Sequence, residues 1–101
     1  MKKLLLIVII FILSQTVLAD DKMNLGLEVY NNKAQCGVCH TLKSAMSDGQ
    51  IGPDLDHLKP TILQIINVVT NGIGVMPSME GILTSEEIEA VAYFVFNSTN
   101  D

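Results

Sequence analysis

The chain is 101 residues long, and 49% of its residues are hydrophobic. Its formal net charge is −5, because six lysines and no arginine stand against eleven acidic residues. A surface basic enough to bind nucleic acid is therefore excluded. The length fits one small domain, near the size at which a hydrophobic core alone gives only marginal stability.

Residues 1–19 have the features of a secretory signal peptide. Two lysines precede an unbroken apolar run from Leu4 to Leu13, and a small-residue cleavage site ends at Ala19. The run is about ten residues, well short of the roughly twenty that span a bilayer. Retention as an uncleaved membrane anchor is the alternative. We expect residues 20–101 to form one exported domain without a membrane span, with a net charge of −7 from four lysines and eleven acids.

The first helix of this domain is predicted from Met23 to about Ala34. Leu25, Val29 and Tyr30 give it a partial apolar face. Gly26 lies inside the predicted helix, where it costs about 1 kcal/mol relative to alanine. Either the helix is weak, or another backbone approaches it closely at this glycine.

The next segment, Cys36-Gly37-Val38-Cys39-His40, is the attachment signature of a c-type haem. On one helical turn the two thiols would share a face and form thioether bonds to the two vinyl groups of one porphyrin, and His40 would reach the iron. A redox dithiol would be expected within a βαβ unit, which is not predicted here. A zinc site needs about four ligands, and the chain has one further histidine, His57.

The second half of the domain is predicted to contain two more helices. Residues 41–58 look irregular, since serine, glycine and aspartate interrupt them. Pro60 suits the first position of a helix that ends at Asn71, and Gly72 suits the residue just after it. A second loop, rich in glycine, methionine and proline, covers residues 72–83. No segment alternates with period two, so no sheet is expected.

A capping box, Thr84-Ser85-Glu86-Glu87, opens the last predicted helix. Its apolar residues recur with helical spacing, which predicts a buried face made of Ile88, Val91, Ala92 and Val95. The domain should therefore be all-helical.

Haem iron has a second axial position, and the side chains that qualify are Met23, Met46, His57, Met76 and Met79. Met76 is favoured because it lies in a loop between two helices, and because Pro77 restricts it to an extended, stiff conformation. Met23 and Met46 are predicted to pack in the core, and His57 to lie at the surface. His/Met ligation predicts electron transfer without catalysis. The alternative is an open-site haem enzyme or gas sensor with a labile sixth ligand.

At these residues the chain resembles the class I cytochromes c, which are small monohaem electron carriers. Gly26 and Tyr30 precede the Cys36–His40 motif as a glycine and an aromatic do in the family's first helix, where the glycine permits a close crossing with the last helix. Tyr93 looks like the aromatic residue of that last helix. The resemblance implies an all-α cytochrome c domain, with three to four helices wrapped around one haem c attached through Cys36 and Cys39.

Two further segments extend the resemblance. Ile51-Gly52-Pro53-Asp54-Leu55 is similar to the family's Gly-Pro-x-Leu segment. This implies that the Pro53 carbonyl accepts the Nδ1 proton of His40 and that Leu55 packs on the haem. Val75-Met76-Pro77 matches the family's ligand loop, which implies Met76 as the second iron ligand.

A closer likeness concerns the partner. Residues 51–55, 58–60 and 72–77 together look like those of the cytochrome subunits that serve periplasmic sulfite dehydrogenases. This implies a periplasmic one-electron carrier that accepts electrons from a molybdenum enzyme and passes them onward. An acidic carrier would dock on a basic or largely apolar partner surface.

Overall fold

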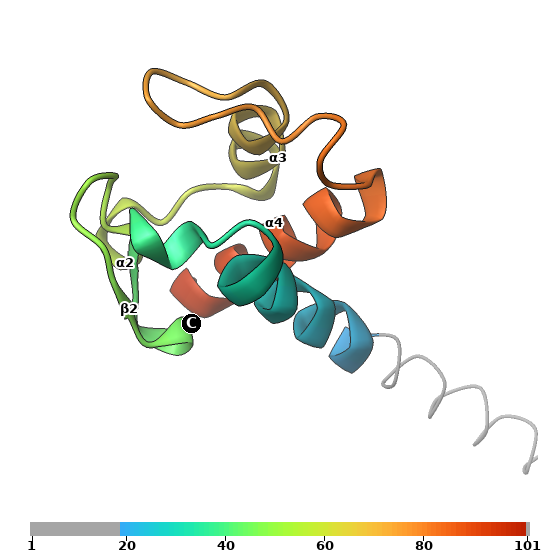
Figure 1. Cartoon of the computed structure of the whole chain (residues 1–101). Coiled ribbons are helices and arrows are strands. Elements are labelled where there is room, and N and C mark those ends of the chain that lie inside the picture. The colour runs from blue at the N-terminus through green and yellow to red at the C-terminus, as the bar shows by residue number, and fades with distance from the viewer. Residues whose placement is uncertain (1–18, 101) are drawn as a thin grey trace, which may run out of the picture.

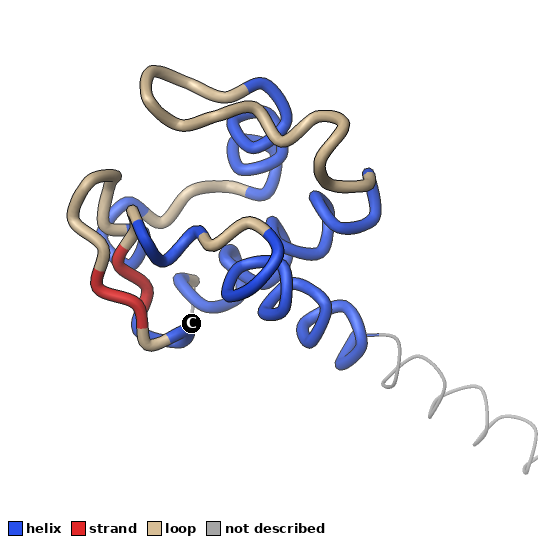
Figure 2. Tube along the Cα trace, in the orientation of Figure 1, coloured by secondary structure: helices blue, strands red, loops and turns tan. Residues whose placement is uncertain are grey.

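The structure, a computed structural model, describes residues 19–100, so the predicted signal segment lies outside the described residues except for Ala19. Helices and helical turns carry nearly all of the regular structure in this part (Figures 1 and 2), as expected for an all-α domain. In chain order the elements are a helix over 19–28, a π-helical turn Val29–Lys33, a 3-10 turn Cys36–Val38, β1 (Thr41–Leu42), a 3-10 turn Lys43–Ala45, β2 (Ser47–Asp48), α2 (Leu55–Leu58), α3 (Ile62–Asn71) and α4 (Ser85–Thr99). None of the helices described within 19–100 has the length and apolar character needed to cross a membrane.

The first helix crosses α4 at Gly26, and the two lie against each other in Figure 1. A Cβ atom on Gly26 would lie 2.2 Å from the carbonyl oxygen of Ala90 and 2.5 Å from the Cβ of Phe94. Real Cβ atoms do not approach other atoms so closely, so only glycine fits. The helix is thus well formed, and the close approach is the reason for the glycine inside it.

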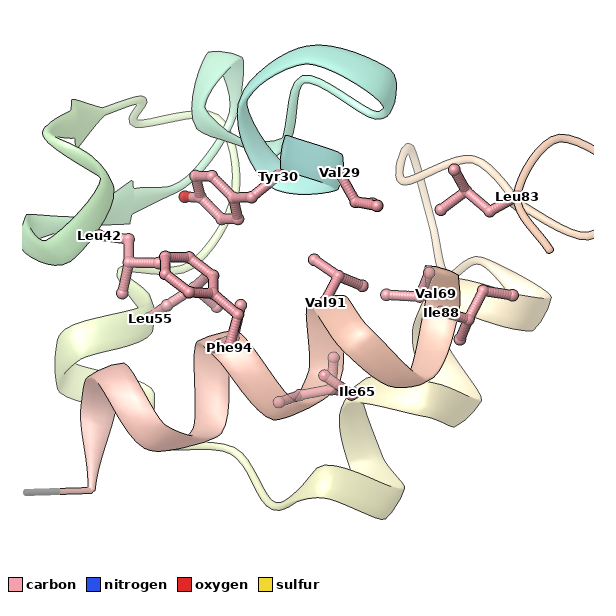
Figure 3. Packing of buried hydrophobic residues seen from close by; sticks show 12 residues of the cluster. Val29, Tyr30, Leu42, Leu55, Ile65, Val69, Leu83, Ile88, Val91 and Phe94 are labelled. Carbon is pink, nitrogen blue, oxygen red and sulfur yellow. The ribbon is translucent and has the colours of Figure 1, made fainter. Parts of the chain in front are cut away.

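The aromatic residue of α4 at this crossing is Phe94, and the expectation of Tyr93 is wrong. The ring centroids of Tyr30 and Phe94 are 5.9 Å apart, and their planes are tilted by 59° (Figure 3). Tyr93 is one position off this face of the helix and is half-buried, with the Lys22 ammonium 5.1 Å from its ring centroid. Tyr30 is fully buried, so this aromatic pair lies inside the core.

Both α3 and α4 begin with a complete capping box. Thr84 and Glu87 form the one predicted for α4, with Thr84 Oγ1 accepting from the Glu87 amide at 3.1 Å and Glu87 Oε1 from the Thr84 amide at 2.9 Å. Thr61 and Gln64 form the same pair of bonds at α3. This helix therefore starts two residues later than predicted, and Pro60 lies before the cap, where it is buried.

The hydrophobic core lies between the first helix, α3 and α4 (Figure 3). The predicted inner face of α4 is confirmed, because all four of its residues are buried. α2 contributes one side chain to the core and β1 another. The buried hydrophobic residues are Val29, Tyr30, Leu42, Leu55, Ile65, Val69, Leu83, Ile88, Ala90, Val91, Ala92, Phe94 and Val95.

The segment predicted to be irregular, residues 41–58, contains four short elements: β1, the 3-10 turn Lys43–Ala45, β2 and α2. β1 and β2 pair antiparallel, with Thr41 opposite Asp48 and Leu42 opposite Ser47, so the expectation of no sheet is wrong here. Strands of two residues are too short to show a period-two pattern. α2 has four residues, and the Asp54 carboxylate caps it. Together these elements hold the chain after the Cys36–His40 motif close to the motif itself.

Candidate functional site

The attachment motif forms a helical turn, as expected. Cys36–Val38 is a 3-10 turn, and the amides of Cys39 and His40 both donate to the Cys36 carbonyl, at 3.1 and 3.0 Å. Gln35 has a φ of 52°, in the left-handed region, so the chain changes direction between the first helix and the motif. Both thiols are free and partly buried, and Cys36 packs against the core.

The surroundings of Cys36 argue against a reactive dithiol, and the described residues do not supply a zinc site. Burial raises the pKa of the Cys36 thiol to about 11, whereas reactive dithiols need a lowered pKa. Across residues 19–100, no three His, Cys, Asp or Glu side chains come together in a group that could hold a metal ion. The two thiols are therefore a better match for attachment to a prosthetic group than for either alternative.

The imidazole of His40 is fixed by the segment that follows the hairpin. Its Nδ1 lies 2.8 Å from the Pro53 carbonyl oxygen, so the hydrogen bond that the resemblance implied is present. A carbonyl can only accept, so Nδ1 carries the proton. The neighbouring Gly52 lies flat against the ring, since a Cβ on Gly52 would be 2.7 Å from His40 Cε1. In the neutral ring, Nε2 keeps its lone pair for a metal.

The backbone of His40 is held as well, by residues that sequence reasoning missed. Its carbonyl accepts from Ser47 Oγ at 3.0 Å and from the Gly49 amide at 3.2 Å. Ser47 Oγ also lies 2.8 Å from the Tyr30 hydroxyl. The one hydroxyl hydrogen of Ser47 is directed to the His40 carbonyl, so Tyr30 donates to Ser47. The only sequence signal was a tyrosine on an apolar face, whose buried hydroxyl needs a partner.

Met76 and Met79 are both partly buried and pack against the edge of the core. Met76 and Ile73 exchange backbone hydrogen bonds, at 3.1 Å from the Ile73 amide and 2.9 Å from the Met76 amide. The Met79 amide donates to the Val69 carbonyl in the last turn of α3, at 2.9 Å. Gly72 has a φ of 74° and opens this loop directly after α3.

The remaining candidate side chains lie as follows. Met46 is 94% exposed, so its predicted place in the core is wrong; it is at a left-handed turn between β1 and β2, where the side chain leaves the core. Met23 is partly buried against the core. His57 is exposed on α2, as predicted. Leu55 is buried in the core beside Leu42 and Phe94 (Figure 3).

The residues present fit a covalently bound haem. Two free thiols are spaced by a helical turn, and the next residue is an imidazole that keeps one nitrogen for the iron. Two thioethers, those of Met76 and Met79, lie later in the sequence, in the loop that is hydrogen-bonded to α3. Two thiols followed by an imidazole are the groups that attach and bind haem c, and a thioether is a suitable second ligand for its iron.

Comparison with known proteins agrees with this chemistry. A family model described as "Cytochrome C oxidase, cbb3-type, subunit III" matches residues 21–95. Cytochrome c6 from Leptolyngbya boryana is 33% identical over 76 residues, covering 71% of this chain and 87% of that protein. The crystal structure of the c-type cytochrome SorU from Sinorhizobium meliloti is 49% identical, with a TM-score of 0.74, and the match covers 79% of this chain and 93% of that one.

The family match spans most of the chain and includes both cysteines and the histidine of the motif. The matched proteins are c-type cytochromes by name, and the structural match extends to the arrangement of the helices. The chain therefore belongs to this cytochrome family: it is a small class I c-type cytochrome, an electron-transfer protein that carries one haem c attached through Cys36 and Cys39.

Proposed function

We propose that this cytochrome is a periplasmic one-electron carrier whose iron is held between the imidazole of His40 and the thioether of Met76. The bound haem supplies a centre that gains and loses one electron. The observation that best supports the proposal is the 2.8 Å contact from His40 Nδ1 to the Pro53 carbonyl, because it fixes the ring and directs Nε2 to the metal.

Each residue of the proposed site has a separate task. Pro53 keeps His40 in one tautomer and orientation, and Leu55 presents an apolar side chain toward the haem. Met76 supplies a soft sulfur that favours the reduced state and thus raises the potential. With His40 and Met76 both bound to it, the iron would have no open position for oxygen or peroxide. Transfer of electrons without turnover of a substrate follows from this arrangement.

The proposed location follows from the first nineteen residues together with the haem chemistry. Removal of residues 1–19 as a signal peptide would release the domain of residues 20–101 into the periplasm, where haem is attached to such motifs. Intact mass spectrometry of the protein from the native host tests both the removal of residues 1–19 and the attachment of haem. We expect the mass of residues 20–101 plus one haem. A mass that includes residues 1–19 would instead indicate a retained anchor.

The proposed electron donor is a periplasmic sulfite dehydrogenase, a molybdenum enzyme. The proposal rests on the resemblance of residues 51–55, 58–60 and 72–77 to the cytochrome subunits of those enzymes, and the 49% identity to the c-type cytochrome SorU supports it. Apolar side chains stand exposed in all three of these segments, Ile51 by 70%, Leu58 by 55% and Val75 by 89%, so the segments suit an apolar contact. Fast haem reduction by such an enzyme and sulfite is expected. Failure of reduction would leave the carrier with another donor.

The iron ligands are tested by visible spectroscopy of the oxidised protein. A weak charge-transfer band reports the bond between methionine sulfur and ferric iron. We expect this band to disappear in Met76→Ala and to persist in Met79→Ala, which is the matched control in the same loop. Persistence in Met76→Ala would contradict the assignment. Rapid carbon monoxide binding to the reduced wild type would favour the open-site enzyme or gas sensor.

A further inference from the structure

The loop that carries Met76 is hydrogen-bonded to α3 at its two ends, which we call its base. Its tip, residues 73–75, is exposed. At the tip, Ile73 is 66% and Val75 89% exposed, and a Cβ on Gly74 would meet no atom within 4 Å. Crowding begins at Gly72, where a Cβ would lie 2.7 Å from both the Met76 carbonyl oxygen and the Ser78 amide nitrogen. The position of Met76 therefore depends on the hydrogen bonds that hold the base of the loop.

The base is fastened to the C-terminal end of α3. The last carbonyls of a helix have no partner inside it and must be satisfied from elsewhere. Here the Val68 carbonyl accepts from the Gly72 amide at 2.7 Å, and the Val69 carbonyl from the Met79 amide at 2.9 Å. The Thr70 carbonyl accepts from the Ser78 hydroxyl at 2.6 Å. Two residues on the far side of Met76 are thus bonded to the helix.

On the C-terminal side of Met76, Ser78 is the nearest residue that is hydrogen-bonded to α3. Pro77 has no amide hydrogen to donate. Among the hydrogen bonds of residues 19–100, the segment of Met76, Pro77 and Ser78 reaches α3 only through the Ser78 side chain. The same oxygen also accepts from the Glu80 amide at 3.3 Å, which holds the hydroxyl in place.

We propose that Ser78 is a positioning residue that sets how firmly Met76 is held on the iron, an inference that rests on the proposed His/Met ligation. The Ser78 hydroxyl holds the chain beside Met76 against α3, so the thioether stays preorganised for a weak bond. Without the hydroxyl, the segment swings outward with its exposed tip, and small ligands reach the iron more often.

The test is displacement of the methionine from the oxidised, haem-loaded protein by imidazole, followed by stopped-flow absorbance. The limiting rate at saturating imidazole reports the release of Met76. We expect Ser78→Ala to raise this rate about fivefold, the factor that follows from losing the neutral hydrogen bond that joins this segment to α3. Ser78→Thr keeps the hydroxyl and is expected to keep the wild-type rate. Ser78 is exposed, so neither substitution disturbs the core.

Ser44→Ala is the matched control, because Ser44 is an exposed serine in the 3-10 turn Lys43–Ala45, far along the chain from the loop. An unchanged rate in Ser78→Ala, or an equal increase in Ser44→Ala, would overturn the role of Ser78 while the charge-transfer band still supported Met76 as the ligand. A band that survives in Met76→Ala would overturn the ligand assignment and this inference together.

Discussion

Tyr30 carries a hydroxyl group on a fully buried aromatic ring, and within residues 19–100 this hydroxyl is hydrogen-bonded to Ser47. The Tyr30 side chain is fully buried, and burial raises the pKa of its hydroxyl, so the group stays protonated and able to donate. Replacing Tyr30 with phenylalanine keeps the ring against Phe94 and removes the donor. We expect a loss of about 1 kcal/mol in the free energy of unfolding, measured with denaturant.

The relay from Tyr30 through Ser47 to the His40 carbonyl also predicts coupling. Ser47→Ala removes both bonds at once, so adding Tyr30→Phe to it should change stability little. Tyr93→Phe is the control, since Tyr93 is half-buried and its hydroxyl has no hydrogen-bond partner within residues 19–100. Strictly additive losses in the double variant would show that the two hydroxyls act independently.

Gly26 sets two physical effects against each other. Helix propensity alone predicts that Gly26→Ala stabilises the protein by about 1 kcal/mol. Packing predicts the opposite sign, because the new Cβ would lie 2.2 Å from the Ala90 carbonyl oxygen. Overpacking of this kind costs about 1–3 kcal/mol, so we expect net destabilisation in denaturant unfolding. Asn24→Ala, at an exposed position of the same helix, should be neutral or stabilising. A stabilised Gly26→Ala variant would show that the helices can separate freely.

The ion pair of Lys33 and Glu87 joins the end of the π-helical turn Val29–Lys33 to the start of α4. Lys33 donates to the carboxylate of Glu87, which also accepts from the Thr84 amide in the capping box. The Lys33 hydrogen bond, then that of Thr84, lowers the pKa of Glu87 below its ordinary value of 4.5. The Glu87 carboxylate in turn raises the pKa of Lys33 above 10.5, by hydrogen bonding first and by charge second.

The signs of these shifts predict a stability window. A lowered Glu pKa adds stability above pH 4.5 that is lost as the pH falls through the folded-state pKa, and a raised Lys pKa adds stability below pH 10.5 that is lost as the pH rises. Glu87→Gln keeps an acceptor for the Thr84 amide and removes the pair. Its deficit in unfolding free energy should be present between these limits, shrink outside them, and decrease with salt because Lys33 is half-exposed.

Glu86→Gln provides the comparison for this window, since Glu86 is an exposed neighbour in the first turn of α4 and is in no ion pair among residues 19–100. Denaturant unfolding of the three proteins across the pH range measures the difference. A Glu87→Gln deficit that does not vary with pH would show that the ion pair adds no stability beyond the cap.

The elements that sequence reasoning located are those whose signals are local. The capping box of α4 and its helical spacing of apolar residues predicted both the start and the buried face. The start of α3 was misplaced because proline at a first helical position outweighed the equally local pair of Thr61 and Gln64. The hairpin of β1 and β2 gave no pattern, since its two-residue strands are specified by tertiary contacts with the motif.

In the site, too, the features with local sequence signals could be predicted and those that depend on tertiary contacts could not. The thiols and His40 follow from spacing along the chain, and the contact of Pro53 with His40 followed from family resemblance. Ser47 and Ser78 could not be found in this way, because each acts through one hydroxyl that only the fold brings to a carbonyl. Sequence reasoning also could not choose between the adjacent aromatic residues Tyr93 and Phe94. A difference of one residue decides which side chain faces the helix crossing, and composition does not distinguish the two.

For the molecule as a whole, the haem is expected to be part of the core. α3 has ten residues and α2 four, lengths at which isolated helices are marginal in water. A domain near this size gains only about 3–5 kcal/mol from its own core. We therefore expect the Cys36→Ala/Cys39→Ala variant, which cannot attach haem, to lose most of its cooperative thermal unfolding and much of its helicity by circular dichroism.

The single variant Cys39→Ala distinguishes the effect of the haem itself on stability from the effect of its two covalent bonds. It keeps one thioether bond through Cys36, together with His40, so it should unfold cooperatively at a temperature between those of the wild type and the double variant. Exposed Met46→Ala controls for substitution near the motif and should match the wild type. A double variant that unfolds as cooperatively as the wild type would show that the helices hold together by their own packing. The small core around Tyr30 and Phe94 would then be sufficient, and the haem would be bound by a domain already formed.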